Sequence, residues 1–137
     1  MFFKKNKKED EDKNFVKIAS LLIHAAKIDE NFSKTEEKII TEALLKLGVK
    51  KESLESIIKA GKLMEENANQ ILDFTREVKN MDENKKIQII ETLWQIIYSN
   101  KEADIYETNL MRRLAGLLYV DNKTMGDIKE KIKKENS

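Results

Sequence analysis

The segment HAAKIDENFSKTEEKII places oxygen-bearing side chains at alternate positions, as a calcium-binding loop does. Asp29, Asn31 and Ser33 match the first, third and fifth positions of the EF-hand template. That template also requires a glycine at its sixth position, for a sharp turn, and a glutamate at its twelfth, to complete the coordination of the ion. Lys34 and Ile40 stand at these two positions. The spacing therefore excludes an EF-hand, and the polar cluster needs another explanation.

Ser33 and Glu36 have the spacing of a capping box. In this motif the hydroxyl accepts a hydrogen bond from the backbone amide three residues on, and the carboxylate accepts one from the amide of the capping residue. The pair predicts that a helix begins directly after Ser33 and that Glu36 lies on its first turn.

A second copy of this arrangement follows 71 residues later, since Glu36 aligns with Glu107 and 107 minus 36 is 71. About thirty residues align at this offset without a gap. The other aligned pairs are Asp29 with Asn100, Ser33 with Asp104, Leu47 with Leu118, Val49 with Val120, and Ser53 with Thr124. Each copy contains a helix, a short polar linker, a capped helix, a turn led by valine and another capped helix. The sequence predicts an internal duplication whose approximate two-fold relation brings the two linkers together.

Four oxygen-bearing side chains at the linkers are the candidate metal ligands: Asp29, Glu36, Asn100 and Glu107. If the linkers meet, their carboxylates repel one another, and a hard divalent cation such as calcium or magnesium relieves that repulsion. Because Asn100 is an amide and Lys101 stands beside it, we expect weak binding, no tighter than about 10⁻⁴ M. The alternative is that these residues only cap helix ends, which stabilises each end by about 1 kcal/mol.

The remaining elements follow from composition and periodicity. The 137 residues include no proline, four glycines and 37% charged side chains, many of them in register with an apolar helical period. Three helices are predicted with both ends, at Phe15 to about Asp29, Ser33 to Gly48, and about Gln70 to Met81. Two more are predicted by their starts, one capped by Ser53 and one that begins after Asp82. Two further capped helices complete the second copy. We expect an all-α, single-domain bundle of about seven helices.

The domain is expected to cover residues 14–134, a length that forms a core without disulfides or metal. Residues 1–13 are expected to form a mobile charged tail, because their side chains bury little apolar area. Phe2 and Phe3 beside two lysines raise the question of a membrane contact. One short signal gives only marginal attachment, so we favour a frayed end.

Composition also excludes several function classes. Without cysteine the chain has no disulfide, thiolate nucleophile or cysteine-type zinc site, which fits a reducing, cytoplasmic environment. Its 26 basic and 25 acidic side chains leave a formal charge of +1, so no basic surplus favours nucleic acid. No segment is long and apolar enough to be a signal peptide or a membrane span.

The other distinctive side chains have structural explanations. His24 is the only histidine, and we expect it to be a hydrogen-bonded helix residue rather than a metal ligand. Phe74, Trp94 and Tyr98 have the helical spacing of core residues, although a ligand pocket is the alternative.

Arg112 and Arg113 are neighbours, so their side chains diverge by about 100° around a helix. We expect one of them to pair with a linker carboxylate. An anion site built from both is the alternative, although the chain lacks the glycine-rich loop that usually accompanies such a site.

Several short motifs occur together in the second copy. They comprise Phe74, Thr75 and Arg76; Leu93 and Trp94; Asp104, Tyr106 and Glu107; and Arg112, Arg113, Ala115, Leu117 and Leu118, while the first copy carries Asp29, Phe32, Ser33 and Glu36. In this combination, from about Phe15 to Ile132, the chain resembles the tellurite-resistance protein B (TerB-like) family.

The resemblance implies an all-helical domain of about seven helices with no known catalytic activity. It also implies acidic linkers suspected of binding a divalent ion, and a role in tellurite and other stress responses near membrane partners. The chain departs from the family pattern in both linkers. Asn100 and Lys101 stand where the family has aspartate and glycine, and Glu30 stands where it usually has glycine.

We therefore predict a non-catalytic domain that binds a protein partner, with a weak cation site between the linkers as its regulator. One alternative is a homo-oligomeric adaptor without metal, which associates through exposed apolar residues such as Leu63 and Met64. Another is a metal-dependent hydrolase in which Glu36 and Glu107 act on a metal-bound water, although no nucleophile or cofactor motif accompanies them.

Overall fold

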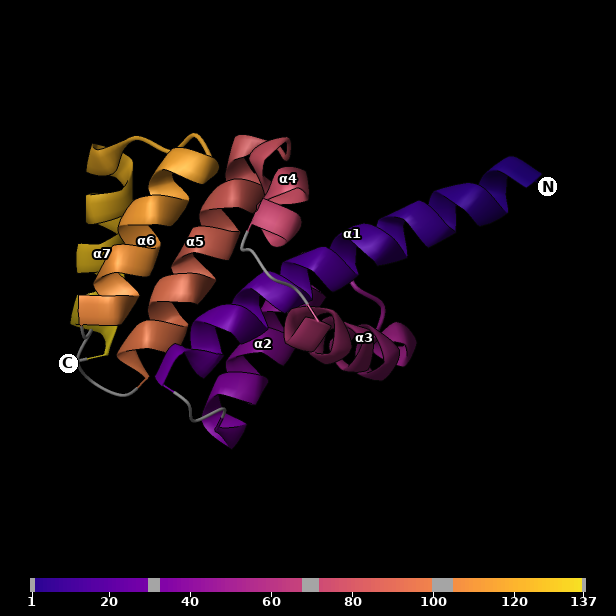
Figure 1. The fold of residues 1–137 in the computed structure, drawn as a ribbon, viewed down its shortest axis with the longest axis horizontal. Coiled ribbons are helices and arrows are strands. Elements are labelled where there is room, and N and C mark those ends of the chain that lie inside the picture. Colours follow the sequence, from indigo (N-terminus) through magenta and orange to yellow (C-terminus); the bar gives the residue numbers. More distant parts are fainter. Residues whose placement is uncertain (1, 30–32, 68–71, 100–104, 137) are drawn as a thin grey trace.

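A computed structural model of the chain describes residues 2–29, 33–67, 72–99 and 105–136. Within these ranges the protein consists of helices without a strand (Figure 1), so the all-α prediction is confirmed. The elements are α1 (Phe2–Ala26), η1 (Lys27–Asp29), α2 (Lys34–Lys46), η2 (Lys51–Ser53), α3 (Leu54–Asn67), α4 (Leu72–Lys79), α5 (Glu83–Tyr98), α6 (Ile105–Leu117) and α7 (Asn122–Glu135), where η marks a 3₁₀ helix.

The internal duplication is visible in the helix boundaries. A shift of 71 residues converts the bounds of α2, Lys34–Lys46, into those of α6, Ile105–Leu117. Both helices end in the same way, with a residue of positive φ, which is Gly48 at 111° and Tyr119 at 57°. The residue after each turn closes it, because the amides of Val49 and Val120 each donate a hydrogen bond of 3.0 Å back into the helix.

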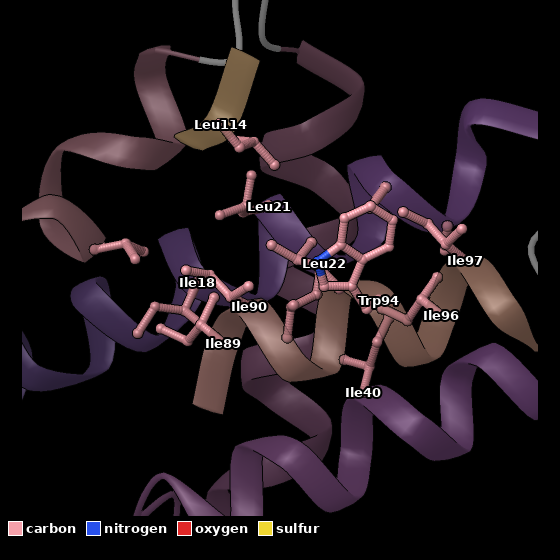
Figure 2. Packing of buried hydrophobic residues seen from close by; sticks show 14 of the residues in the cluster. Ile18, Leu21, Leu22, Ile40, Ile89, Ile90, Trp94, Ile96, Ile97 and Leu114 are labelled. Carbon is pink, nitrogen blue, oxygen red and sulfur yellow. The ribbon is translucent and has the colours of Figure 1, made fainter. Parts of the chain in front are cut away.

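α1 and α5, the first helices of the two copies, form the centre of the bundle. α1 packs against α2, α3, α4 and α5, while α5 also packs against α2 and α7. Figure 2 shows apolar side chains of these two helices meeting those of α2 and α6, and the labelled ones include Leu21, Leu22, Ile90, Trp94, Ile40 and Leu114. Both copies therefore contribute to one hydrophobic core.

The two copies differ in how closely their first and third helices approach. A Cβ atom added to Gly61 of α3 would lie 2.9 Å from the Cβ of Ala19 in α1, so this contact requires glycine. At the same contact between α1 and α3, the hydroxyl of Ser20 donates a hydrogen bond of 3.1 Å to the carbonyl oxygen of Gly61. In the second copy the position equivalent to Gly61 is Ile132, which is fully buried. The second pair of helices thus packs around a large side chain.

The first helix begins earlier than the sequence indicated. We predicted its start at Phe15, but α1 already begins at Phe2. The charged residues before Phe15 lack an apolar stripe, yet Lys and Glu are good helix formers, and pairs such as Lys5 with Glu9 have the helical spacing of opposite charges. Mobility of residues 1–13 and the 14–134 domain boundary stay predictions.

Two predicted caps lie elsewhere. Ser53 does not start α3, because the chain is already helical from Lys51 in η2, whose capping residue, Lys50, makes no side-chain cap hydrogen bond. Asp121, not Thr124, caps α7, and its carboxylate accepts a hydrogen bond of 2.7 Å from the backbone amide of Thr124. The predicted start of a helix after Asp82 is confirmed, because α5 begins at Glu83, and the structure adds that Asp82 caps it by accepting a hydrogen bond of 2.9 Å from the amide of Lys85.

No helix in the described ranges has both the length and the apolar character needed to cross a membrane.

Candidate functional site

The predicted metal ligands are only partly within the described residues. Glu36 and Glu107 are described in full, whereas Asp29 is described by its backbone alone, at the end of η1. Asn100 lies outside the described ranges, as does Asp104, the predicted cap of α6. Convergence of all four ligands therefore stays a prediction.

Glu36 forms the capping box that the sequence predicted. The backbone amide of Ser33 donates to Oε1 of Glu36 at 2.9 Å, and the amide of Glu36 donates to Oγ of Ser33 at 3.1 Å. Ser33 has the extended backbone of a capping residue, with φ −84° and ψ 164°. Only 2% of Glu36 is exposed, so this carboxylate is held inside the protein at the start of α2.

Glu107 occupies the equivalent position in the second copy. It lies on the first turn of α6 and is 5% exposed. Its charge acts on Tyr98 at the end of α5: burial, the negative charge of Glu130 and that of Glu107, in this order, raise the pKa of the Tyr98 phenol. Each copy therefore buries one glutamate where a helix starts after a linker.

The chemistry of these two glutamates fits a hard cation, because calcium and magnesium prefer oxygen ligands. One oxygen of Glu36 already serves the cap of α2, so a cation there would share that carboxylate with the helix start. In the ranges that the structure describes, no three acidic or histidine side chains are grouped closely enough to hold a metal ion. A complete site would need the linker residues Asp29 and Asn100.

A pocket with a volume of about 370 Å³ lies where the two copies adjoin. Its lining comes from both, namely His24 and Ile28 of the first copy and Tyr106, Asn109, Leu110 and Arg113 of the second. Tyr106 is 71% exposed although its helix neighbour Glu107 is buried. Residues that flank the two linkers therefore line one pocket, whose lining combines apolar side chains with an exposed aromatic ring and a guanidinium group.

His24 is a hydrogen-bonded helix residue, as predicted. Its Nδ1 lies 3.4 Å from Oε1 of Glu65 in α3, and Nζ of Lys27 donates to the other oxygen of Glu65 at 2.8 Å. The hydrogen bond to Glu65 is the main reason why the pKa of Lys27 is raised. No local sequence pattern indicated the role of Glu65, because Glu65 pairs with residues about forty positions away.

The aromatic residues that we placed in the core are buried where they are described. Trp94 and Tyr98 are 2% and 5% exposed, and their rings stack with centroids 5.9 Å apart. The Nζ of Lys129 lies 5.6 Å above the Trp94 ring. The Nε1 of Trp94 is buried and has no hydrogen-bond partner among the described atoms. The side chain of Phe74 lies outside the described part of the chain.

The predicted surface groups have mixed outcomes. Arg112 and Arg113 are both exposed, and the side chain of the linker carboxylate Asp29 lies outside the described residues, so the predicted pairing of one arginine with a linker carboxylate stays a prediction. Leu63 is 61% exposed, as the oligomer alternative requires. Met64 is partly buried and packs against the core, so its assignment to an exposed face is wrong.

Comparison with known proteins gives one result. Searches among curated proteins and among solved structures give no match. The family model described as "Tellurite resistance protein TerB" matches residues 15–130, which is most of the 137-residue chain. This match covers both copies, both linkers and both buried glutamates, and the chain therefore belongs to the tellurite resistance protein TerB family.

Proposed function

We propose that this protein is a non-catalytic domain that binds a protein partner at the linker end of the bundle. The description of its family supports a context of tellurite resistance or a related stress response. In this proposal a weakly bound divalent cation at the two linkers regulates the partner site. The protein acts in the cytoplasm, and its partner lies at or near a membrane.

The observation that carries the proposal is the pocket between the two copies. Tyr106 and Arg113 of α6 line this pocket together with the apolar residues Ile28 and Leu110. Tyrosine and arginine contribute more binding energy at protein interfaces than most residues, because they combine a large contact area with hydrogen-bond donors. An exposed tyrosine and arginine next to an apolar pocket favour a protein segment as the ligand.

The buried glutamates supply a route for regulation. Tyr106 and Glu107 are adjacent on the first turn of α6, which follows the second linker directly. A cation that draws Glu107 and the linker residues together would fix this turn and, with it, the position of the Tyr106 ring. Cation binding and partner binding would then strengthen each other.

The cation is tested by the melting temperature of the purified protein in calcium, magnesium or manganese. We expect a rise at millimolar concentrations, because the ion binds the folded state, with a dissociation constant of about 10⁻⁴ M or weaker. Asn100→Asp should tighten binding because it adds a carboxylate, and Asp29→Asn should weaken it. If none of the three ions changes the melting temperature of either the natural protein or Asn100→Asp, the linker residues only cap helices and bind no cation.

The partner surface is tested separately, with a photo-crosslinking residue at position 106 in cells. We expect a defined crosslinked protein that is lost when Arg113→Ala is added, because both residues line the same pocket. A crosslinker at Tyr119 is the matched control, since Tyr119 is also a tyrosine with 71% exposure but lies at the other end of α6. Identical crosslinked products from positions 106 and 119 would contradict a specific site at the pocket.

A further inference from the structure

A small pocket lies between α4 and the turn that follows α6, two segments at the same end of the bundle (Figure 1). It has a volume of 250 Å³ and is lined by Thr75, Arg76, Lys79, Gly116, Leu117 and Tyr119. Pockets for drug-sized ligands measure about 300–1,000 Å³, so this pocket suits a single chemical group. None of its residues belongs to the linkers or to the pocket beside Tyr106.

The lining of this pocket is rich in hydrogen-bond donors and positive charge. Arg76 and Lys79 are three positions apart and therefore lie on one side of α4. Their guanidinium and ammonium groups can only donate, and the hydroxyl groups of Thr75 and Tyr119 can donate as well. No acidic side chain is among the described residues of the lining. A ligand that accepts hydrogen bonds and carries negative charge complements such a pocket.

Basic side chains near the end of a helix often serve its last carbonyl groups. Here other donors serve them. In α6, three carbonyl groups near the end accept hydrogen bonds from the backbone amides of residues 118–120. In α4, the carbonyl of Arg76 accepts from the side-chain amide of Asn80, and that of Val78 accepts from the backbone amide of Met81. Arg76 and Lys79 are therefore not needed to close these helix ends.

The first copy of the duplication shows what is particular about this pocket. At the shift of 71 residues, Gly116 corresponds to Leu45 and Tyr119 corresponds to Gly48. A Cβ atom at Gly116 would meet no atom within 4 Å, so the space beside the pocket is open. Tyr119 has a φ of 57°, and its 71% exposure shows that burial does not compensate for this backbone strain. A strained residue beside an open pocket favours a binding role.

We propose that this pocket binds a phosphate monoester group through Arg76, Lys79 and Tyr119. The guanidinium fork of Arg76 matches two phosphate oxygens. The Nζ of Lys79 lies 5.3 Å from the centroid of the Tyr119 ring and supplies a second positive charge beside the phenol. Two positive charges match the charge of about −1.5 to −2 that a phosphate monoester carries at pH 7. The inference does not depend on the proposed function, which uses the other end of α6.

Titration of the ¹⁵N-labelled full-length chain with phenyl phosphate, followed by NMR at constant ionic strength, tests the site. Amide signals of residues 75–79 and 116–120 should shift with a dissociation constant of about 1 mM, the affinity that a few charged hydrogen bonds give at an exposed site. Phenyl acetate carries one negative charge on a similar ring and should bind at least about tenfold more weakly, because it makes fewer charged hydrogen bonds.

Variants of the lining separate binding from stability. Arg76→Ala should weaken binding at least about tenfold, the effect of losing a charged hydrogen bond. Tyr119→Gly and Gly116→Leu introduce the residues of the first copy, and each should weaken binding at least about threefold. Neither should lower the melting temperature, because one relieves the positive φ and the other replaces a glycine inside a helix. Arg112→Ala is the control, since Arg112 is an exposed arginine of α6 outside the pocket, and its affinity should be unchanged.

Three results would overturn the proposal: pocket signals that phenyl phosphate leaves unmoved up to about 20 mM, an affinity that Arg76→Ala does not change, or phenyl acetate that binds as tightly as phenyl phosphate. Soluble phosphorylated molecules and the lipid phosphatidic acid share the proposed group. Flotation with vesicles of phosphatidylcholine, with or without phosphatidic acid, distinguishes these two sources. Flotation that requires phosphatidic acid and is lost in Arg76→Ala identifies the lipid head group, whereas phenyl phosphate binding without flotation identifies a soluble ligand.

Discussion

Ser33 and Glu36 start α2 by satisfying each other's backbone amides. We predict that Ser33→Ala lowers the free energy of unfolding by about 0.5–2 kcal/mol, the usual effect of losing a capping side chain. Urea unfolding followed by circular dichroism measures the loss. Ser56→Ala is the control, because Ser56 is an exposed residue inside α3 and caps no helix. Equal effects of the two substitutions would mean that the cap contributes nothing specific.

Tyr98 should make the free energy of unfolding fall at alkaline pH. Its pKa is raised above the ordinary value of 10.0, chiefly by burial. The folded state thus keeps the phenol protonated while the unfolded state ionises, so stability is complete below pH 10.0 and is lost as pH rises through the folded pKa. We predict that Tyr98→Phe makes the decline in unfolding free energy above this pH shallower. Urea unfolding across the alkaline range, with the exposed Tyr106→Phe as control, measures this, and parallel declines would contradict it.

Among the helices, α2 and α6 end in the same type of turn, but the residue with positive φ is a glycine after α2 and a tyrosine after α6. Gly48 has a φ of 111°, which disfavours any L side chain, so Gly48→Ala should lower the free energy of unfolding by about 1–2 kcal/mol. Gly116→Ala is the matched control, because Gly116 lies inside α6 and a Cβ there meets no atom within 4 Å. That change should instead stabilise the protein by about 0.5–1 kcal/mol. Thermal unfolding measures both changes in stability. A change of the same sign for the two substitutions would contradict this prediction.

Tyr119 shows how the second copy tolerates the same turn without glycine. Its φ of 57° is in the left-handed region, which costs an ordinary residue about 1–2 kcal/mol. The Nζ of Lys79 lies 5.3 Å from the centroid of the Tyr119 ring, and an exposed contact of this type contributes about 0.5–1 kcal/mol. The contact between α4 and the end of α6 therefore offsets part of the backbone strain.

At the scale of the whole molecule, the two copies share one core and should unfold together. Ile40 and Met111 are equivalent residues of α2 and α6, and both are at most 1% exposed. We predict that Ile40→Ala and Met111→Ala each lower the unfolding free energy by about 2–5 kcal/mol. Circular dichroism and the fluorescence of Trp94, the single tryptophan, should report one coincident transition in urea for each variant. Separate transitions would mean that the copies are independent units.

Features that depend on neighbouring residues could be predicted from the sequence. The capping box at Ser33, the helix start after Asp82 and the apolar stripes of the helices all arise from contacts within about four positions, so spacing alone predicts them. The same local patterns made the 71-residue duplication visible. Local patterns failed at Ser53 and Thr124, since several polar residues near each helix start have the character of a cap and the backbone geometry selects one.

Contacts between residues of distant segments became known only from the packing of the helices. Glu65 joins His24 and Lys27 across α1 and α3, and Tyr106 comes to lie beside Ile28, because helix packing brings these residues together and no local spacing encodes it. Packing also decided burial: Glu107 is enclosed while Tyr106, its neighbour on the first turn of α6, faces solvent. The physical reason is that a helix sequence sets the angle between adjacent side chains, whereas the position of the other helices sets which of those angles points into the core.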